Sequence, residues 1–233
     1  MTAERPVQVP VVRREVPARP LAPGVTVAEL LDDRQGCRGL HQRRLRFASG
    51  AELTGATGGR GEAWYVIAGS GTLEGGTVAL GPGTAVWLPE SLGYRCRALQ
   101  DGLDIVAATV RAGDPAPAGS ALRVTTLDAC APERTGDREF RVLLSSGLTI
   151  TQFAGLIPPG RAPVHHHAYD EVVHVLAGRG VVHLSAGDTP IGPGTSIYLP
   201  PYQPHCLENT GRDPLRVLGV FHPAASPAAK QER

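Results

Sequence analysis

Two stretches in the second half of the chain decide the fold: GRAPVHHHAYDEVVHVLAG at residues 160–178 and GTSIYLPPYQPHCLEN at residues 194–209. Both combine short apolar runs with Gly and Pro, which is typical of strands separated by turns. Histidine is unevenly distributed, because seven of the eight histidines follow Gly160. Imidazoles gathered on strands and turns indicate a metal site within a β-rich fold.

Four side chains in these stretches have the spacing of a metal site. On an extended strand, His165 and His167 point to one side and His166 to the other. Glu171 begins the next strand after a short turn, and His205 follows a proline-rich turn. Three neutral imidazoles and one carboxylate leave one or two coordination positions open, as a catalytic site requires. The sequence therefore predicts one divalent metal bound by His165, His167, Glu171 and His205.

An internal repeat extends this pattern over most of the chain. Residues 66–71 read VIAGSG and residues 175–180 read VLAGRG, while residues 80–89 read LGPGTAVWLP and residues 191–200 read IGPGTSIYLP. A supersecondary unit that occurs twice predicts two structurally equivalent halves. The expected strands include Ala63–Ile67, Thr84–Leu88, Val172–Leu176 and Ser196–Leu199.

Composition favours an all-β chain and excludes several classes of partner. Glycine (29) and proline (21) exceed a fifth of the 233 residues, and both are unfavourable inside helices. The best helical candidate, Val27–Asp33, has room for one or two turns. Net charge is +1, and the densest basic stretch, at residues 43–46, is expected on a solvated strand face. The sequence has neither the broad basic surface that binds nucleic acid nor an apolar stretch long enough to span a membrane, so we expect neither partner. We therefore expect a cytoplasmic protein with reduced cysteines.

The two motifs resemble those of the cupin superfamily. The first motif is Gly, His-x-His, Glu, Gly, and the second is Gly, Pro-x-Gly, His, Asn. The matching residues are Gly160, His165, His167, Glu171, Gly178, Gly194, Pro200, His205 and Asn209. Two positions depart from the pattern: the spacer after Gly160 is one residue shorter, and Tyr202 replaces a Gly. The resemblance implies two double-stranded β-helix (jelly-roll) barrels in tandem, which is a bicupin.

The first half lacks the histidines of the second. Glu62 aligns with Glu171 and Tyr94 with His205, but the positions of His165 and His167 fall in the Gly-rich run GATGGRG. We therefore expect a degenerate barrel in which Trp64 fills the vacant pocket. The expected organisation is an extended arm (1–20), a degenerate cupin barrel (21–112), a linker (113–125), a metal-binding cupin barrel (126–224) and a disordered tail (225–233).

The expected function is that of a metal-dependent enzyme acting on a small polar, oxygen-chelating substrate. The favoured activity is that of an oxygenase of the dioxygenase type, in which Glu171 is a metal ligand and the catalytic base. The alternatives are a non-oxidative isomerase, decarboxylase or aminohydrolase, and a non-catalytic small-molecule binder. Iron(II) or manganese(II) is the favoured metal, with nickel, cobalt or zinc as alternatives. Substrate contacts are expected from Arg161, Tyr169, Tyr202 and Gln203, and the apolar N-terminal arm suits strand exchange in a homodimer.

Overall fold

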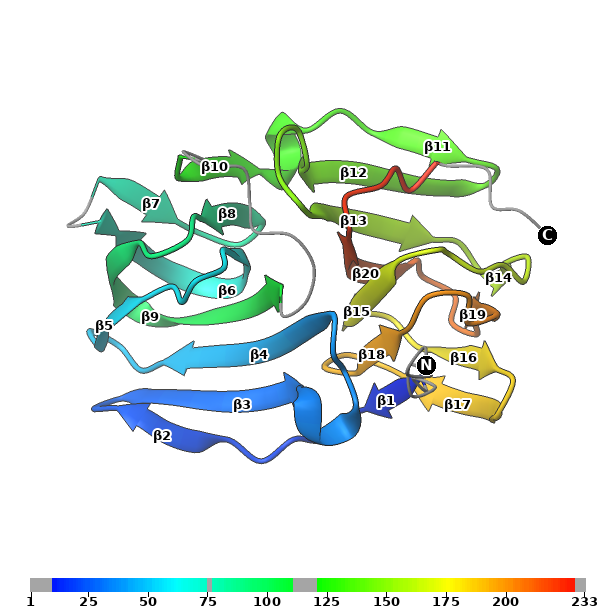
Figure 1. Ribbon diagram of the computed structural model, residues 1–233, viewed down its shortest axis with the longest axis horizontal. Coiled ribbons are helices and arrows are strands. Elements are labelled where there is room, and N and C mark those ends of the chain that lie inside the picture. The colour runs from blue at the N-terminus through cyan, green and yellow to red at the C-terminus, as the bar shows by residue number, and fades with distance from the viewer. Residues whose placement is uncertain (1–9, 75–76, 111–120, 229–233) are drawn as a thin grey trace, which may run out of the picture.

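The structure is a computed structural model that describes residues 10–74, 77–110 and 121–228 (Figure 1). Within these residues it contains strands and short 3-10 turns but no α-helix, which confirms the all-β prediction. Two barrels lie side by side, one from each half of the repeat. None of the helical segments in the described residues has the length and apolarity to cross a membrane.

The N-terminal barrel is formed by one sheet of nine strands. Their bounds are β2 (Arg19–Ala22), β3 (Val25–Leu31), β4 (Leu40–Phe47), β5 (Glu52–Ala56), β6 (Glu62–Leu73), β7 (Val78–Leu80), β8 (Thr84–Leu88), β9 (Gly93–Val110) and β10 (Arg123–Thr126). The order is β10-β8-β6-β9-β4-β3-β2, with β5 beside β9 and β7 beside β6. The long strands β6 and β9 bend around the core, which register shifts along their pairing permit.

The C-terminal barrel has a seven-stranded and a four-stranded sheet. The strands are β1 (Val11–Arg13), β11 (Glu133–Thr135), β12 (Arg138–Leu144), β13 (Thr151–Ile157), β14 (Gly160–Arg161), β15 (Asp170–Ala177), β16 (Gly180–Leu184), β17 (Gly187–Ile191), β18 (Ser196–Leu199), β19 (His205–Asn209) and β20 (Leu215–His222). The orders are β1-β18-β15-β20-β13-β12-β11 and β14-β19-β16-β17. Alternate residues such as Val173, Val182 and Ile197 point inward and form the core between the sheets.

Each half of the chain contributes one strand to the other barrel. Strand β1 pairs antiparallel with β18, so the N-terminal arm completes the C-terminal sheet of its own chain. Strand β10 pairs antiparallel with β8 and completes the N-terminal sheet. A shared apolar core between the barrels includes Leu31, Trp87, Val172 and Tyr198. The two halves therefore pack as one unit around this interface.

Four expectations from the sequence differ from the structure. Val27–Asp33 is strand β3 up to Leu31, because both of its edges pair, and a 3-10 turn follows at Asp33–Gln35. The stretch 43–46 is not simply a solvated face, since its side chains form partly buried ion pairs. Residues 123–125 of the expected linker belong to β10, and residues 113–120 lie outside the described residues.

The expected disordered tail, residues 225–233, is the fourth difference. Residues 225–228 belong to the described part of the chain, whereas residues 229–233 lie outside it. The Ala225 amide donates a hydrogen bond to Thr151 Oγ1 at 3.2 Å. Ala225 also packs against a cluster of three phenylalanines in the C-terminal barrel. The beginning of the tail is therefore held against the barrel.

Candidate metal centre

Neighbouring elements of the C-terminal barrel bring three histidines together. His165 and His167 lie in the loop between β14 and β15, and His205 is the first residue of β19. The His165 amide donates to the His205 carbonyl at 3.0 Å, and the His205 amide donates back at 2.9 Å. This reciprocal pair holds the two imidazoles side by side, with ring centroids 4.3 Å apart. The His167 ring centroid lies 5.0 and 5.2 Å from those of His165 and His205.

The donor atoms are arranged so that one cation could bind them. One ring nitrogen from each of His165, His167 and His205 lies within 4.8 Å of the others. Glu171, the second residue of β15, places Oε2 at 3.2 Å from His167 Nε2 and 3.7 Å from His205 Nε2. This oxygen is buried and accepts no well-formed hydrogen bond within the described residues. A buried carboxylate oxygen facing imidazole nitrogens fits a metal bound between them.

Backbone carbonyls orient two of the imidazoles. His165 Nδ1 lies 2.9 Å from the Pro163 carbonyl, and His205 Nδ1 lies 2.9 Å from the Gln203 carbonyl. A carbonyl oxygen can only accept, so Nδ1 carries the proton in both rings and Nε2 keeps its lone pair. This is the tautomer that a metal-ligating histidine with a backbone partner adopts. The two rings are therefore ready to act as Nε2 donors.

Burial and mutual charge set the protonation states of the centre. Burial, reinforced by His205, lowers the pKa of His165 from 6.5 to about 4. Burial likewise lowers the pKa of His205, against the opposing effect of Glu171. Burial raises the pKa of Glu171, but the nearby imidazoles, His167 above all, outweigh it, so this pKa lies below its ordinary value. Neutral imidazoles beside an ionised carboxylate are the forms that bind a divalent cation.

Aromatic and aliphatic side chains enclose the centre. Tyr169 stacks on His167 with ring centroids 4.7 Å apart and an interplanar angle of 13°. Phe221 lies 5.5 Å from the His167 ring and 4.9 Å from that of Phe153. The three histidines and Glu171 open into a cavity of about 450 Å³, whose other walls are mostly apolar. Apolar walls lower the local polarity and so strengthen electrostatic interactions within the cavity.

The residues expected to contact substrate lie in different places. Arg161 is exposed, and its Nε donates to Cys206 Sγ at 3.4 Å, outside the cavity lining. Tyr202 is 67% exposed and also lies outside that lining. Gln203 donates to Ser185 Oγ and to its neighbouring proline carbonyl. Tyr169 is closest to the centre, through its stacking on a histidine ring.

Several cavity residues on β11, β12, β13 and β20 carry no motif in the sequence and were not predicted. Arg138, Thr135, Phe140 and Phe153 line the cavity, although all four precede the first histidine motif in the chain. Alternation within β12 was the available signal, because it places Arg138 and Phe140 on the same face. Only the sheet order β12-β13-β20-β15 shows that this face meets the cavity that Glu171 also lines.

Three histidines outside the centre, His174, His183 and His222, contact polar groups of their own. His174 Nδ1 lies 2.9 Å from Ser196 Oγ, which donates to Gln42 of the other barrel at 2.6 Å. His183 lies between Asp188 and Glu208 on the four-stranded sheet. His222 Nδ1 lies 3.1 Å from a backbone carbonyl, and His166 faces Tyr202 with ring centroids 6.2 Å apart.

The equivalent position in the N-terminal barrel contains an ion pair. Arg43 Nη2 donates to both carboxylate oxygens of Glu62, at 3.0 and 2.8 Å. Trp64 Nε1 donates to the same carboxylate at 2.9 Å and packs edge-on against Tyr94. Trp64 is completely buried, so it fills the pocket as expected. A guanidinium thus neutralises the carboxylate that corresponds to Glu171.

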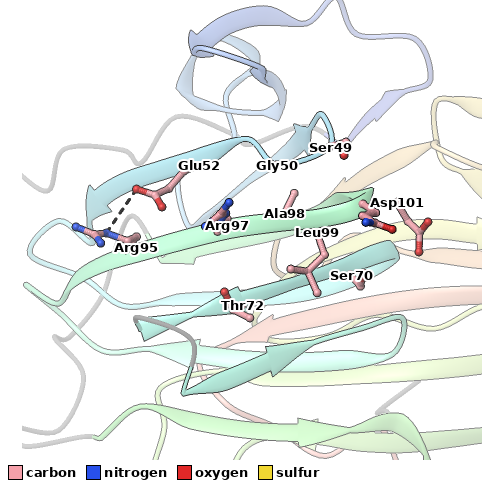
Figure 2. A pocket seen from close by; sticks show the side chains of 11 residues that line it. Ser49, Gly50, Glu52, Ser70, Thr72, Arg95, Arg97, Ala98, Leu99 and Asp101 are labelled. Carbon is pink, nitrogen blue, oxygen red and sulfur yellow. Dashed lines mark ion pairs between the residues drawn. The ribbon is translucent and has the colours of Figure 1, made fainter.

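A second hollow lies on the N-terminal barrel, away from the histidines. A recess of about 760 Å³ runs along β5, β6 and β9 of the N-terminal barrel (Figure 2). Its lining includes the Arg95–Glu52 ion pair, which joins Nε and Oε1 at 3.5 Å. Histidine and cysteine are absent from this lining, and the aliphatic side chain of Leu99 is exposed. The imidazole cavity, which has metal-binding side chains in its lining, is therefore the better candidate site.

Comparisons with known proteins find a domain match and similar structures. Residues 154–221 match the cupin domain family. An uncharacterized protein of Methanocaldococcus jannaschii is 34% identical over 73 residues, which are 30% of this chain and 58% of the relative. A glucose-6-phosphate isomerase of Thermococcus kodakarensis is 34% identical over 65 residues, which are 24% of this chain and 34% of the relative. The matched regions thus span little more than half of the first curated relative and a third of the second.

Solved structures resemble the chain over nearly its whole length. A mutant of Bacillus subtilis oxalate decarboxylase superposes with a TM-score of 0.77 and 16% identity, covering 94% of this chain and 78% of that one. The formate complex of Lactobacillus farciminis oxalate decarboxylase gives a TM-score of 0.76 and 15% identity, covering 93% and 87%. At this identity the likeness shows the fold. The chain thus matches the cupin domain family over residues 154–221 and shares the fold of these solved structures over nearly its whole length.

Proposed function

We propose that the chain is a metal-dependent enzyme that acts on a small, oxygen-chelating substrate in the C-terminal barrel. The observation that carries the proposal is the buried Glu171 Oε2, which faces His167 and His205 without a well-formed hydrogen bond. His165 completes a set of three nitrogens and one oxygen. This set suits iron, manganese, nickel, cobalt or zinc, and the metal would polarise a substrate oxygen.

The side chains around the centre provide for substrate binding and proton transfer. Tyr169 and Phe221 pack against His167 and fix its ring. The apolar cavity walls would reduce the number of water molecules around a bound substrate. Glu171, whose pKa lies below its ordinary value, would hold a negative charge at neutral pH and could accept a proton from a substrate that is bound beside it. A metal site, a fixed imidazole ligand and an ionised carboxylate are the groups that metal-assisted proton transfer needs.

Two reactions remain candidates for this one site. The sequence favours an oxygenase, in which the metal supplies oxygen chemistry. The relatives with stated activities are named for decarboxylation and for isomerisation, and these names favour the non-oxidative alternative. We infer that a non-oxidative decarboxylation or isomerisation is the first reaction to test. Substrate-dependent oxygen consumption would select the oxygenase, and turnover under nitrogen would select the non-oxidative reaction.

Metal binding tests the proposal directly. Metal-free protein titrated with manganese(II) or iron(II) under nitrogen should bind about one ion per chain. His165→Ala and His205→Ala should each weaken binding by at least about 10- to 100-fold, because each removes a ligand. The matched control is His166→Ala, which removes the adjacent imidazole and should leave the affinity unchanged. If the wild type binds no ion, or all three variants lose affinity equally, the proposed site is wrong.

A further inference from the structure

Three buried polar atoms, each from a residue that lines the metal cavity, make no well-formed hydrogen bond within the described residues. They are Glu171 Oε2, Thr135 Oγ1 and Arg138 Nε. Buried polar groups are normally paired, because leaving one unpaired costs about 1–3 kcal/mol and more for a charged group. The proposed metal site accounts for Glu171. Thr135 and Arg138 are therefore left as a second polar group in the same cavity.

Strand pairing places Thr135 and Arg138 together. β11 and β12 are antiparallel, and Thr135 lies directly opposite Arg138. Side chains directly opposite on paired strands are close enough to bind one ligand group. Glu139, the neighbouring acid in the lining, lies 3.7 Å from Arg134 and 3.9 Å from Arg141. Arg138 itself forms no ion pair in the part of the chain that the structure describes.

The sheet register sets this pair apart from the metal centre. On β20, Phe221 lies opposite Glu171, whereas Leu215 lies opposite Ile157 of β13. Leu156, the preceding residue, pairs with Glu139, so Arg138 continues the sheet at the level of Ile157. Along β20, the position beside Arg138 and the position beside Glu171 are therefore six residues apart. One ligand can satisfy both groups only if it carries polar atoms at two separate positions.

The surface between the two polar groups is apolar. Phe140, Phe153 and Phe221 form one cluster, and all three line the cavity, together with Val173, Leu199, Leu207 and Val217. Phe140 lies on the same face of β12 as Arg138, and Phe221 packs against His167 at 5.5 Å. A compact, fully polar substrate would leave these walls without contacts. An amphipathic substrate would cover them and would gain from burying apolar area.

We propose that Arg138 and Thr135 bind the carboxylate of an amphipathic substrate, whose apolar body lies on the phenylalanine cluster and whose other end carries the oxygen donors. A guanidinium and a hydroxyl are both donors to a carboxylate. The role of the oxygen donors rests on the proposed function, because these donors are assigned to the metal. The carboxylate site itself is present in the metal-free protein and can be tested there.

Calorimetric titration of the metal-free protein tests the carboxylate site with three probes. Hexanoate has the charge and an apolar body, hexan-1-ol has the apolar body alone, and acetate has the charge alone. We expect hexanoate to bind about 10- to 100-fold more tightly than either other probe, as expected for a hydrogen-bonded charge combined with apolar burial. Equal affinity for hexanoate and hexan-1-ol, or no binding of hexanoate at millimolar concentration, would overturn the proposal.

Variants assign the effect to individual side chains. Arg138→Gln should weaken hexanoate binding about 10- to 100-fold and leave hexan-1-ol unchanged, while Thr135→Val should weaken hexanoate binding by less. Arg138→Lys keeps the charge and should retain part of the affinity. The matched control is Arg212→Gln, at an exposed position outside the cavity. If Arg161→Gln lowers hexanoate affinity and Arg138→Gln does not, the assignment to Arg138 is refuted.

Two further measurements separate this inference from the proposed function. Circular dichroism and the urea midpoint show whether each variant is folded before its affinity is interpreted. His205→Ala should weaken metal binding by at least about 10- to 100-fold but leave hexanoate binding by the metal-free protein intact. A wild type that binds hexanoate but no metal would refute the proposed function and leave the carboxylate site standing. A wild type that binds metal but not hexanoate would refute the carboxylate site alone.

Discussion

Replacing Arg43 by methionine should destabilise the N-terminal barrel by about 3–5 kcal/mol, the usual loss when one partner of a buried ion pair is removed. The Glu62 side chain is 7% exposed, and Arg43 donates to both of its carboxylate oxygens. Trp64 Nε1 would still donate to this carboxylate. One neutral donor cannot replace a guanidinium, so the variant would hold a buried and largely uncompensated negative charge.

Tryptophan fluorescence during urea unfolding can isolate this barrel. Both tryptophans of the chain, Trp64 and Trp87, belong to its strands. The double variant Arg43→Met with Glu62→Leu should recover most of the lost free energy of unfolding, because apolar residues can replace a buried pair at little cost.

A surface ion pair provides the control for this experiment. Arg19 and Glu29 lie 3.1 Å apart, but their side chains are 61% and 30% exposed. Arg19→Met should therefore change the free energy of unfolding by less than about 1 kcal/mol. If Arg43→Met and Arg19→Met unfold at the same urea concentration, the buried pair does not stabilise the barrel and the reasoning fails.

Three further predictions concern the C-terminal barrel. Tyr202 has a φ of 64° and is 67% exposed. Tyr202→Gly should therefore relieve backbone strain and raise the free energy of unfolding by about 1 kcal/mol. A lower melting temperature of the variant would contradict this prediction. Burial lowers the pKa of His174 from 6.5 to about 4, so stability should be complete above pH 6.5 and fall as the pH drops toward 4. His174→Asn should flatten this dependence, and an unchanged slope of the urea midpoint against pH would count against it. A Cβ at Gly219 would lie 2.2 Å from Phe153 Cζ, so Gly219→Ala should displace this ring and destabilise the barrel by about 1–3 kcal/mol, measured by urea unfolding.

Local sequence patterns determined the strands and the spacing of the histidines. The expected strand Thr84–Leu88 is β8, and Ser196–Leu199 is β18. Alternation and turn residues act over a few positions, so these elements could be recognised without knowledge of the fold. The same reasoning predicted that Trp64 would point inward beside Glu62, and the structure confirms it. The motif spacing also placed His165 and His205 in one predicted site.

The tertiary structure alone decided which distant residues share a cavity or a core. Arg43 belongs to a basic stretch that suggested solvent exposure, yet β4 directs it to Glu62. Arg138 stands 27 positions before His165 and carries no motif, but the sheet order brings it to the same cavity. Strands β1 and β10 cross between the halves, which no local pattern indicates. These relations depend on strand order and register between segments far apart in the chain. A single sequence fixes the faces of its strands, whereas their neighbours are chosen by the packing of the whole molecule.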